Sequence, residues 1–376
     1  MRNIKYILVL AMVFAFQFTY SQGCEGPGEG DGINFFGFIQ PQFEYVNNEV
    51  NSKYNTNLPD DTSGFFFNRA RLGVMGNIPY DFSYYFIVEY APAAGFGICD
   101  AFVSYNRFAP YMSAAVGQFK VPFGAEQLQG CHKLYTIDRS MVSGNIGAPI
   151  RDVGLMLSGG SGDKIKLGEN GPSNVIGYQL AYMNGEGRDL ISNEEPLAGI
   201  FDKYSIYAGR LTFTPSKHFT LGGGFKYGKG IPSSDVVEYD EKIRYGIDGK
   251  LDYKNFILQA EYLYGKDKGS IEKIVGEGCG ATVETVPGSD SKDGFYVTAL
   301  YKTKWNLEPV VKFESFDTSL NTDDDKVMRW TTGINYFFNE WTRLQVNYQY
   351  NLTEAPIPAG DFYHDTVQIQ LQAIIK

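Results

Sequence analysis

The C-terminal quarter of the sequence alternates apolar and polar residues one by one along two long runs. In the first run, Leu344, Val346, Tyr348 and Tyr350 alternate with Arg343, Gln345, Asn347 and Gln349; in the second, Val367, Ile369, Leu371 and Ala373 alternate with Thr366, Gln368, Gln370 and Gln372. A period of two residues is that of a β-strand with one apolar and one polar face. Because each buried amide needs hydrogen-bond partners, the glutamines favour a polar face that meets water over the core of a β-sandwich. The pattern therefore predicts a transmembrane β-barrel with lipid outside and water inside.

The N-terminus has the pattern of a secretory signal peptide. Arg2 and Lys5 precede an uncharged stretch over 6–18, and small residues at Thr19 and Ser21 predict cleavage after Ser21. No other window approaches the ~20 apolar residues that a membrane-spanning helix needs, which excludes a helical membrane protein. We therefore expect a signal peptide at 1–21, a flexible N-terminal lead at 22–32 and a single transmembrane β-barrel at 33–376.

The composition agrees with an all-β protein, since 15% of residues are aromatic and 43 are glycine. The mean hydropathy of −0.24 does not argue against a membrane protein, because a barrel has one lipid face and one wet face. A net charge of −10 argues against nucleic acid as a partner.

Sixteen strands are expected along the chain, joined by connections that alternate between tight and long. The expected strands are 33–46, 65–78, 80–92, 98–108, 111–120, 151–159, 174–184, 203–213, 218–229, 242–253, 255–265, 294–304, 307–317, 328–338, 341–352 and 363–375. The long connections are 47–64, 121–150, 185–202, 230–241, 266–293, 318–327 and 353–362. Short periplasmic turns and long outer loops are typical of outer-membrane barrels.

The connection 121–150 is unusually long for a segment without helical periodicity, and such loops usually carry function. In the strand before it, Ala115, Gly117 and Phe119 form an apolar face opposite Gln118 and Lys120. Its position between two membrane strands predicts a long third loop that folds into the lumen and narrows it.

Four segments together resemble the phosphate-selective porin O and P family. They are FNRARLGVMGNIPYDFSYYFIVEYAP (67–92), GQFKVPFGAEQL (117–128), DRS (138–140) and RDVGLML (151–157), and the resemblance continues more weakly through 331–338 and 346–350. It implies a sixteen-stranded barrel, commonly trimeric, whose third loop enters the lumen and whose basic wall residues pass anions. Where the family often has adjacent arginines entering the second strand, this chain has Asn68 and Arg69.

Six basic residues are the candidate pore-lining or anion-lining set: Arg69, Arg71, Lys120, Lys133, Arg139 and Arg151. Arg69 and Arg71 share a strand face with Phe67, and because an arginine on the lipid face costs ~2–4 kcal/mol, we expect them to face the lumen. Rings of positive charge in a pore select anions. By the same parity the acidic residues Glu44, Glu89, Asp100, Asp152, Asp248, Glu261 and Glu314 also face inward. Two interpretations stay open: an anion-selective ladder, or mixed charges that hydrate and cross-link the wall.

Four cysteines, at 24, 99, 131 and 279, allow three complete pairings in an oxidising compartment. Cys99 and Cys131 are expected near the outer rim, where a disulfide between them could bracket the long loop. Neither cysteine spacing nor the three histidines indicates a metal site, a cofactor or a converging catalytic set, so we expect no enzyme.

These features predict a porin of the bacterial outer membrane for passive diffusion of small hydrophilic solutes, with a preference for inorganic anions such as phosphate. Contact with outer-membrane lipid and assembly into a homotrimer are expected. The alternative is a structural or assembly barrel that serves as a subunit of a larger outer-membrane complex.

Overall fold

The computed structural model describes residues 33–47, 61–92, 95–165, 174–185, 205–230, 237, 239–275, 282–322, 325–353 and 365–375. The expected signal peptide and N-terminal lead lie outside these residues, as do Cys24 and Cys279. The described residues form sixteen strands: β1 (Ile33–Asn47), β2 (Thr62–Ile78), β3 (Phe82–Ala91), β4 (Gly95–Phe108), β5 (Met112–Lys120), β6 (Arg151–Gly160), β7 (Ile176–Met183), β8 (Ser205–Ser216), β9 (Phe219–Gly230), β10 (Asp240–Tyr253), β11 (Phe256–Val275), β12 (Thr282–Tyr301), β13 (Leu307–Asp317), β14 (Lys326–Phe337), β15 (Thr342–Thr353) and β16 (Asp365–Ile375).

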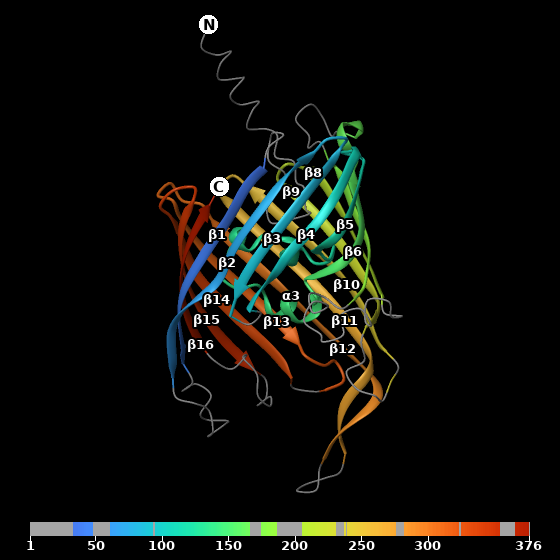
Figure 1. Cartoon of the computed structure of the whole chain (residues 1–376). Coiled ribbons are helices and arrows are strands. Elements are labelled where there is room, and N and C mark those ends of the chain that lie inside the picture. Colours follow the sequence, from blue (N-terminus) through green and yellow to red (C-terminus); the bar gives the residue numbers. More distant parts are fainter. Residues whose placement is uncertain are drawn as a thin grey trace.

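The strands form one closed antiparallel barrel in which each strand pairs with its neighbours in sequence (Figure 1). β1 closes the ring on β16, with a register that runs from Gly37 opposite Ile375 to Asn47 opposite Asp365. Closure leaves no strand edge unpaired, which is what a sheet must achieve inside a bilayer. The predicted all-β, sixteen-stranded barrel is confirmed. No helix in the described part of the chain is long and apolar enough to cross a membrane.

The alternation expected at the C-terminus is present in β15 and β16. Gln345 and Asn347 are buried inside the barrel, whereas Val346 and Tyr348 are exposed on its outer surface. A polar inward face and an apolar outward face are what the period of two residues predicted.

Two local departures from the expected strands have clear causes. β11 and β12 stay paired from Phe256 opposite Tyr301 to Val275 opposite Thr282, so most of the connection expected at 266–293 is strand. The polar residues there suggested a loop, although both runs also contain β-branched residues that favour strands. In β2 the register shifts, with Arg69 opposite Gln40 but Phe67 opposite Pro41. Asn68 is the extra residue of a bulge. The expectation that Phe67 shares a face with Arg69 is therefore wrong.

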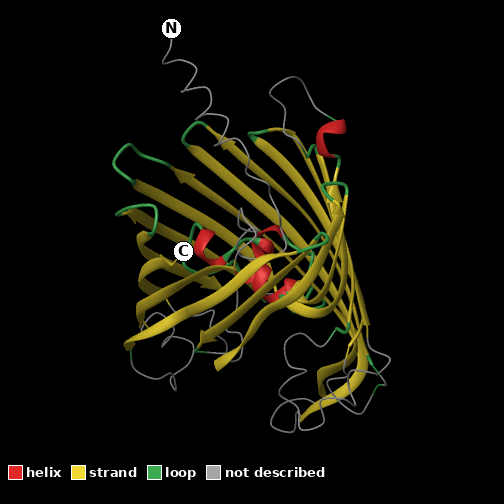
Figure 2. Ribbon diagram, turned by 45° about the horizontal axis from the view of Figure 1, so that its top comes forward, coloured by secondary structure: helices red, strands yellow, loops and turns green. Residues whose placement is uncertain are grey.

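Residues 121–150, here called the inner segment, leave the wall after β5 and rejoin it at β6. They contain three short helical turns, α2 (Ala125–Leu128), η2 (Cys131–Lys133) and α3 (Met141–Gly147), which the sequence did not predict. Figure 2 shows the helices of this segment inside the ring of strands, whereas η3 (Gly162–Lys164) lies in the connection that follows β6. Gly124, with φ 75°, adopts the left-handed conformation that glycine tolerates before α2. The Ser140 hydroxyl caps α3 by accepting a hydrogen bond from Ser143 N at 3.1 Å.

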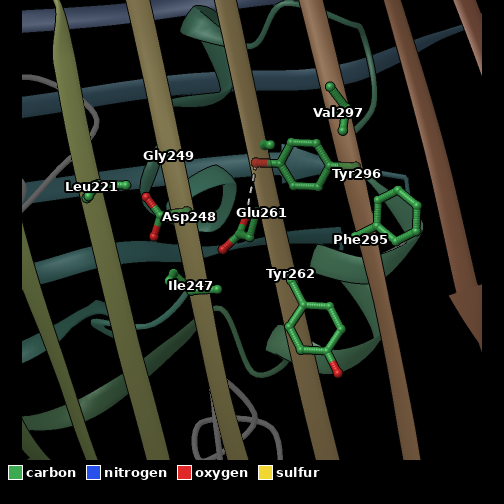
Figure 3. A pocket seen from close by; sticks show the side chains of 10 residues that line it. Leu221, Ile247, Asp248, Gly249, Glu261, Tyr262, Phe295, Tyr296 and Val297 are labelled. Atoms are coloured by element: carbon green, nitrogen blue, oxygen red, sulfur yellow. Dashed lines mark hydrogen bonds between the residues drawn. The ribbon is translucent and has the colours of Figure 1, made fainter.

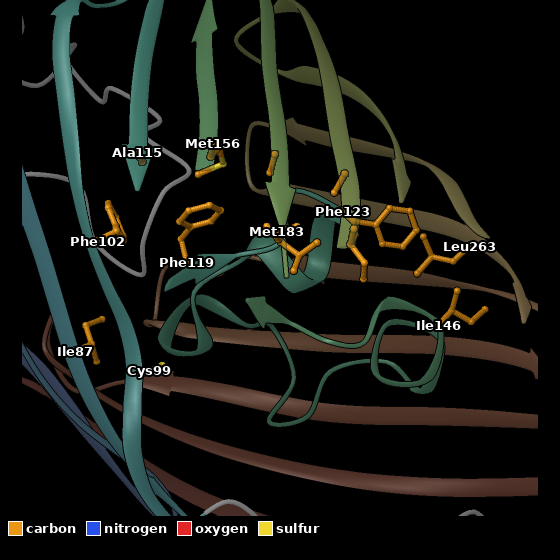
Figure 4. Close-up of a cluster of buried hydrophobic side chains, with 14 of the residues drawn as sticks. Ile87, Cys99, Phe102, Ala115, Phe119, Phe123, Ile146, Met156, Met183 and Leu263 are labelled. Carbon is orange, nitrogen blue, oxygen red and sulfur yellow. The ribbon is translucent and has the colours of Figure 1, made fainter. Parts of the chain in front are cut away.

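A cluster of apolar side chains fills part of the barrel interior (Figure 4). Phe123 and Ile146 of the inner segment are buried in it together with Ala115 and Phe119 of β5. Ala115 and Phe119 are 0% exposed, whereas Val116 is 62% exposed on the outer surface. The apolar side chains at 115 and 119 therefore face the interior, because the inner segment supplies apolar partners there. Gly117, with φ 132°, interrupts the alternation that the sequence suggested for this strand.

Candidate pore constriction

Acidic and amide side chains of the barrel wall accept hydrogen bonds from the backbone of the inner segment. The Glu261 carboxylate of β11 accepts from Ala125 N at 2.6 Å and from Glu126 N at 3.2 Å, at the start of α2. The Tyr296 hydroxyl of β12 donates to the same carboxylate at 3.0 Å (Figure 3). The same hydroxyl accepts a hydrogen bond from Gln259 at 2.8 Å. Glu261 is therefore held by the wall on one side while it binds the inner segment on the other.

Two further acceptors act along the rest of the inner segment. Glu314 of β13 accepts a hydrogen bond from Met141 N at 3.1 Å, and Asn347 of β15 accepts one from Ile137 N at 2.8 Å. A cavity of about 300 Å³ lies on β9 to β12, around Glu261 and Tyr296, and includes exposed side chains such as Leu221 and Ile247. It is lined by Leu221, Ile247, Asp248, Gly249, Ala260, Glu261, Tyr262, Phe295, Tyr296 and Val297. Figure 3 shows the residues that line it.

Basic and amide side chains bind the carbonyl groups of the same segment. Their contacts are Lys120 with Leu128 and Gln129, Lys226 with Gly147 and Ala148, Arg244 with Ile146, Lys312 with Asp138, Asn335 with Tyr135, and Arg343 with His132 and Leu134. The wall thus holds the backbone of the inner segment from β5, β9, β10, β11, β13, β14 and β15. Because the partners are backbone groups, no residue pattern in the inner segment could have indicated these contacts.

Three of the six predicted pore-lining residues are buried and engaged with the protein. Arg71 forms an ion pair with Glu89, and Arg151 forms one with Asp100 through two hydrogen bonds of 3.0 and 3.1 Å. Lys120 Nζ lies 3.0 and 2.9 Å from its two carbonyl acceptors in the inner segment. A charge bound to protein groups in this way cross-links the wall, as the second interpretation of the sequence supposed.

The other three predicted residues keep part of their surface exposed. Arg69 is half-buried and donates to Gln40 at 3.3 Å. Arg139 is half-buried and donates to the carbonyls of Glu126 at 3.2 Å and Gln129 at 2.8 Å. Lys133 is exposed. Within the described part of the chain, none of these three side chains forms an ion pair with a carboxylate.

Two carboxylates, those of Glu44 and Asp138, add negative charge at the inner segment and share one hydrogen-bond donor. Gln368 donates to Asp138 at 2.6 Å and to Glu44 at 2.9 Å, so one amide bridges the inner segment and the wall. Both carboxylates are half-buried. The glutamines of β16 were expected to be satisfied by water in the lumen, but Gln368, Gln370 and Gln372 are buried and bind protein groups. That expectation is wrong because the inner segment binds Gln368 and Gln372, and Gln345 of β15 binds Gln370.

Cys99 and Cys131 are both buried and both free, so the disulfide predicted between them is not formed. Cys131 lies instead among cations: Arg139 Nη1 and Nη2 are each 3.6 Å from its Sγ. Burial raises the pKa of the Cys131 thiol, but Arg71, Arg139, Arg69 and Lys120 outweigh it and hold that pKa well below its usual range. Positive charge is therefore concentrated around η2.

The geometry agrees with what the comparisons with known proteins find. The sequence model of the phosphate-selective porin O and P family matches residues 42–218. No curated protein matches the chain.

Three solved structures illustrate the likeness of fold. An anion-selective porin from Comamonas acidovorans is 13% identical with a TM-score of 0.64, and the alignment covers 92% of this chain and 99% of that one. OmpT, an outer membrane protein of Vibrio cholerae in its trimer form, is 12% identical with a TM-score of 0.59 and the same two coverages. OmpF of Salmonella typhi in complex with daunomycin is 15% identical with a TM-score of 0.56, covering 92% of this chain and 98% of that one.

Family and fold together point to a channel rather than an enzyme. The resemblance that the sequence suggested is confirmed over residues 42–218, where the chain matches the phosphate-selective porin O and P family, and this match together with the fold indicates a porin of the bacterial outer membrane.

Proposed function

We propose that this porin passes small hydrophilic solutes through a bore narrowed by the inner segment, with a weak preference for inorganic anions set by Arg69, Arg139 and Lys133. The observation that carries the preference is the difference in exposure within the predicted basic set. These three keep exposed surface without a carboxylate partner in the described residues, whereas Arg71 and Arg151 are neutralised by buried carboxylates. A cation paired with a carboxylate has little net field, whereas an unpaired charge that a solute can approach acts on its passage.

The net charge of −10 does not decide the selectivity. Charges farther than a Debye length of ~8 Å are screened at physiological salt, whereas charges at a constriction act on the permeating ion directly. Glu44 and Asp138 lie at the inner segment as well, and they reduce the preference for anions. The anion selectivity named for the Comamonas acidovorans porin supports the proposed sign.

A homotrimer in the outer-membrane lipid is the assembly that we propose. The trimer form of the Vibrio cholerae protein supports it, as does the apolar outward face of the strands. Crosslinking of the protein in native membranes, followed by gel electrophoresis without boiling, measures the number of subunits. A species of one subunit only would contradict the trimer.

The selectivity is tested by the zero-current potential of the reconstituted protein in a potassium chloride gradient. The double variant Arg69→Gln and Arg139→Gln should shift this potential toward cation preference, because two approachable positive charges are lost. Lys268→Gln, which removes one positive charge from the exposed part of β11, serves as the control and should leave the potential unchanged. A wild-type pore that already prefers potassium, or a double variant without a shift, would contradict the anion preference.

One observation favours the alternative, a structural or assembly barrel in a larger complex. Many inward polar side chains are buried, among them Thr331, Asn335, Gln345, Asn347 and Gln370, and two of these, Asn335 and Asn347, bind the inner segment directly. A lumen filled in this way could serve a barrel that only holds partners. Planar bilayers separate the two functions: stepwise conductance of the purified protein supports the porin, and the absence of any step supports the structural barrel.

A further inference from the structure

Two buried cations of the wall, Lys226 and Arg343, donate hydrogen bonds to backbone carbonyls of the inner segment. Lys226 lies in β9 and Arg343 in β15, and the two contact different parts of the segment. Neither forms an ion pair among the residues that the structure describes. They differ in this from Arg71 and Arg151, whose charges are matched by carboxylates.

Lys226 holds the end of the inner segment and packs against its beginning. Its Nζ donates to the carbonyl of Gly147 at 2.9 Å and also to that of Ala148. The same Nζ lies 5.5 Å from the ring centre of Phe123, which is a cation–π contact. A side chain at Gly224, the next inward position of β9, would place its Cβ 3.3 Å from the Phe123 ring. The wall around Lys226 is therefore shaped to receive both ends of the segment.

Arg343 holds the middle of the inner segment, around η2. Its Nη1 donates to the carbonyl of Leu134 at 3.0 Å, and its Nη2 donates to that of His132 at 3.1 Å and to the Gln372 amide oxygen at 3.0 Å. The side chain is 5% exposed. The planar guanidinium thus fixes two carbonyls of the segment and one side chain of the neighbouring strand β16 in a single arrangement.

A buried cation is costly unless polar groups replace its water. Here the carbonyls of the inner segment are the replacement, so the cations and the segment stabilise each other only while they are in contact. In that contact both side chains are covered, and a solute in the bore does not reach them.

We infer that Lys226 and Arg343 are positioning residues: they fix the inner segment across the barrel and so set the width of the bore, but they do not set its preference for anions. The inference rests on the proposed function, in which the inner segment narrows the pore.

Single-channel recording separates width from charge. Lys226→Met and Arg343→Met each remove the donors while keeping an unbranched apolar stem, and each should raise the conductance and the current noise. The rise should persist at about 1 M potassium chloride, where a Debye length of ~3 Å suppresses the effect of a lost charge. The zero-current potential should stay at the wild-type value, in contrast to Arg69→Gln. Lys226→Arg keeps a donor for the carbonyls and should bring the conductance back toward wild type.

The inference is overturned if either methionine variant shifts the zero-current potential as much as Arg69→Gln does and loses its effect at high salt. It is also overturned if the conductance of a folded variant stays at the wild-type value. Folding is checked by faster migration of the unboiled barrel on gels. Should Arg343→Met not fold, Lys226→Met and Arg343→Lys decide the question.

A second measurement needs no conductance and therefore tests the inference even if the porin function fails. Cys131 lies in the inner segment and is 2% exposed, and Cys99 lies in β4 and is 0% exposed. A charged methanethiosulfonate reagent, with peptide mass spectrometry to identify the modified residue, should label Cys131 faster in Arg343→Met than in wild type. Cys99 should stay protected in both. Equal protection of Cys131 in the folded variant would show that Arg343 does not hold the segment.

Discussion

Two regions of the inner surface of the barrel contact the inner segment through different kinds of interaction. They are called here the apolar half, on β3 to β7, and the polar half, on β14 to β16. On β3 to β7 the buried apolar side chains Ile87, Phe102, Ala115, Met156 and Met183 belong to the interior cluster, and buried charged residues such as Glu89 and Asp100 lie on the same strands. On β14 to β16 the polar side chains Thr331, Asn335, Gln345, Asn347 and Gln370 are buried to the same degree. Apart from the two carbonyls that Lys120 binds, the inner segment contacts the apolar half through apolar side chains such as Phe123 and Ile146. It contacts the polar half through backbone groups that Asn335, Arg343 and Asn347 bind.

The two halves contribute differently to the position of the segment. Burial of apolar surface contributes roughly 25 cal/mol per Å², but it has no direction and tolerates sliding. Each hydrogen bond adds only about 0.5–1.5 kcal/mol net, yet it requires a particular distance and angle. The apolar half thus supplies most of the attraction between the wall and the inner segment, and the polar half determines the position that the segment takes in the barrel.

Truncation of a central apolar side chain should have the largest effect on stability. Phe123→Ala removes a fully buried ring of the inner segment and should lower the free energy of unfolding by about 3–5 kcal/mol. Urea titration followed by gel migration without boiling measures this change. Phe225→Ala, at an outward position that is 48% exposed, is the matched control and should cost clearly less. Equal losses would mean that the interior cluster does not stabilise the segment.

A change in the polar half should cost less stability but move the segment more. Asn347→Leu leaves the backbone N–H of Ile137 without its acceptor, which should cost about 1–3 kcal/mol. Hydrogen exchange at Ile137 should become faster than in Phe225→Ala, since the N–H bond is lost and the apolar half is intact. Unchanged exchange at that amide would argue against the division of roles between the two halves.

The smallest effect is expected where neither half is involved. Lys268 and Glu241 form an ion pair of 3.1 Å on the extended parts of β10 and β11, and the lysine is 45% exposed. Lys268→Gln should change the free energy of unfolding by only ~0–1 kcal/mol. A loss as large as that of Asn347→Leu in the same urea titration would show that ion pairs outside the inner segment also hold the barrel.

The wall could be predicted from the sequence because lipid and interior impose opposite demands on alternate residues. β15 and β16 follow their alternation from Arg343 to Leu352 and from Thr366 to Gln372, and the expected bounds of the inner segment match the end of β5 and the start of β6. The prediction fails where the interior is itself apolar, as at Ala115 and Phe119, since alternation alone does not say which face meets lipid. It also fails at Asn68, because a bulge leaves no mark in the period of the residues around it.

The candidate site could be predicted only in part. Parity places Arg71 and Arg151 inside the barrel, but it does not reveal that Glu89 and Asp100 neutralise them. The roles of Lys226 and Arg343 were out of reach for a different reason, because their partners are carbonyl groups that every residue carries. The expected bond between Cys99 and Cys131 rested on the position of the loop alone, and both thiols are free in the structure.

The pairing of β1 with β16 has a consequence for the order of assembly. The inner segment follows β5 in the chain, so its apolar partners on β3, β4 and β5 are synthesised before or with it. Four of its hydrogen-bond partners, Asn335, Arg343, Asn347 and Gln372, come from the last three strands. An unclosed barrel therefore lacks these four contacts, while Lys120, Lys226 and Glu261 of earlier strands already bind the segment. Closure of the last strand onto the first completes the set of contacts that fixes the aperture.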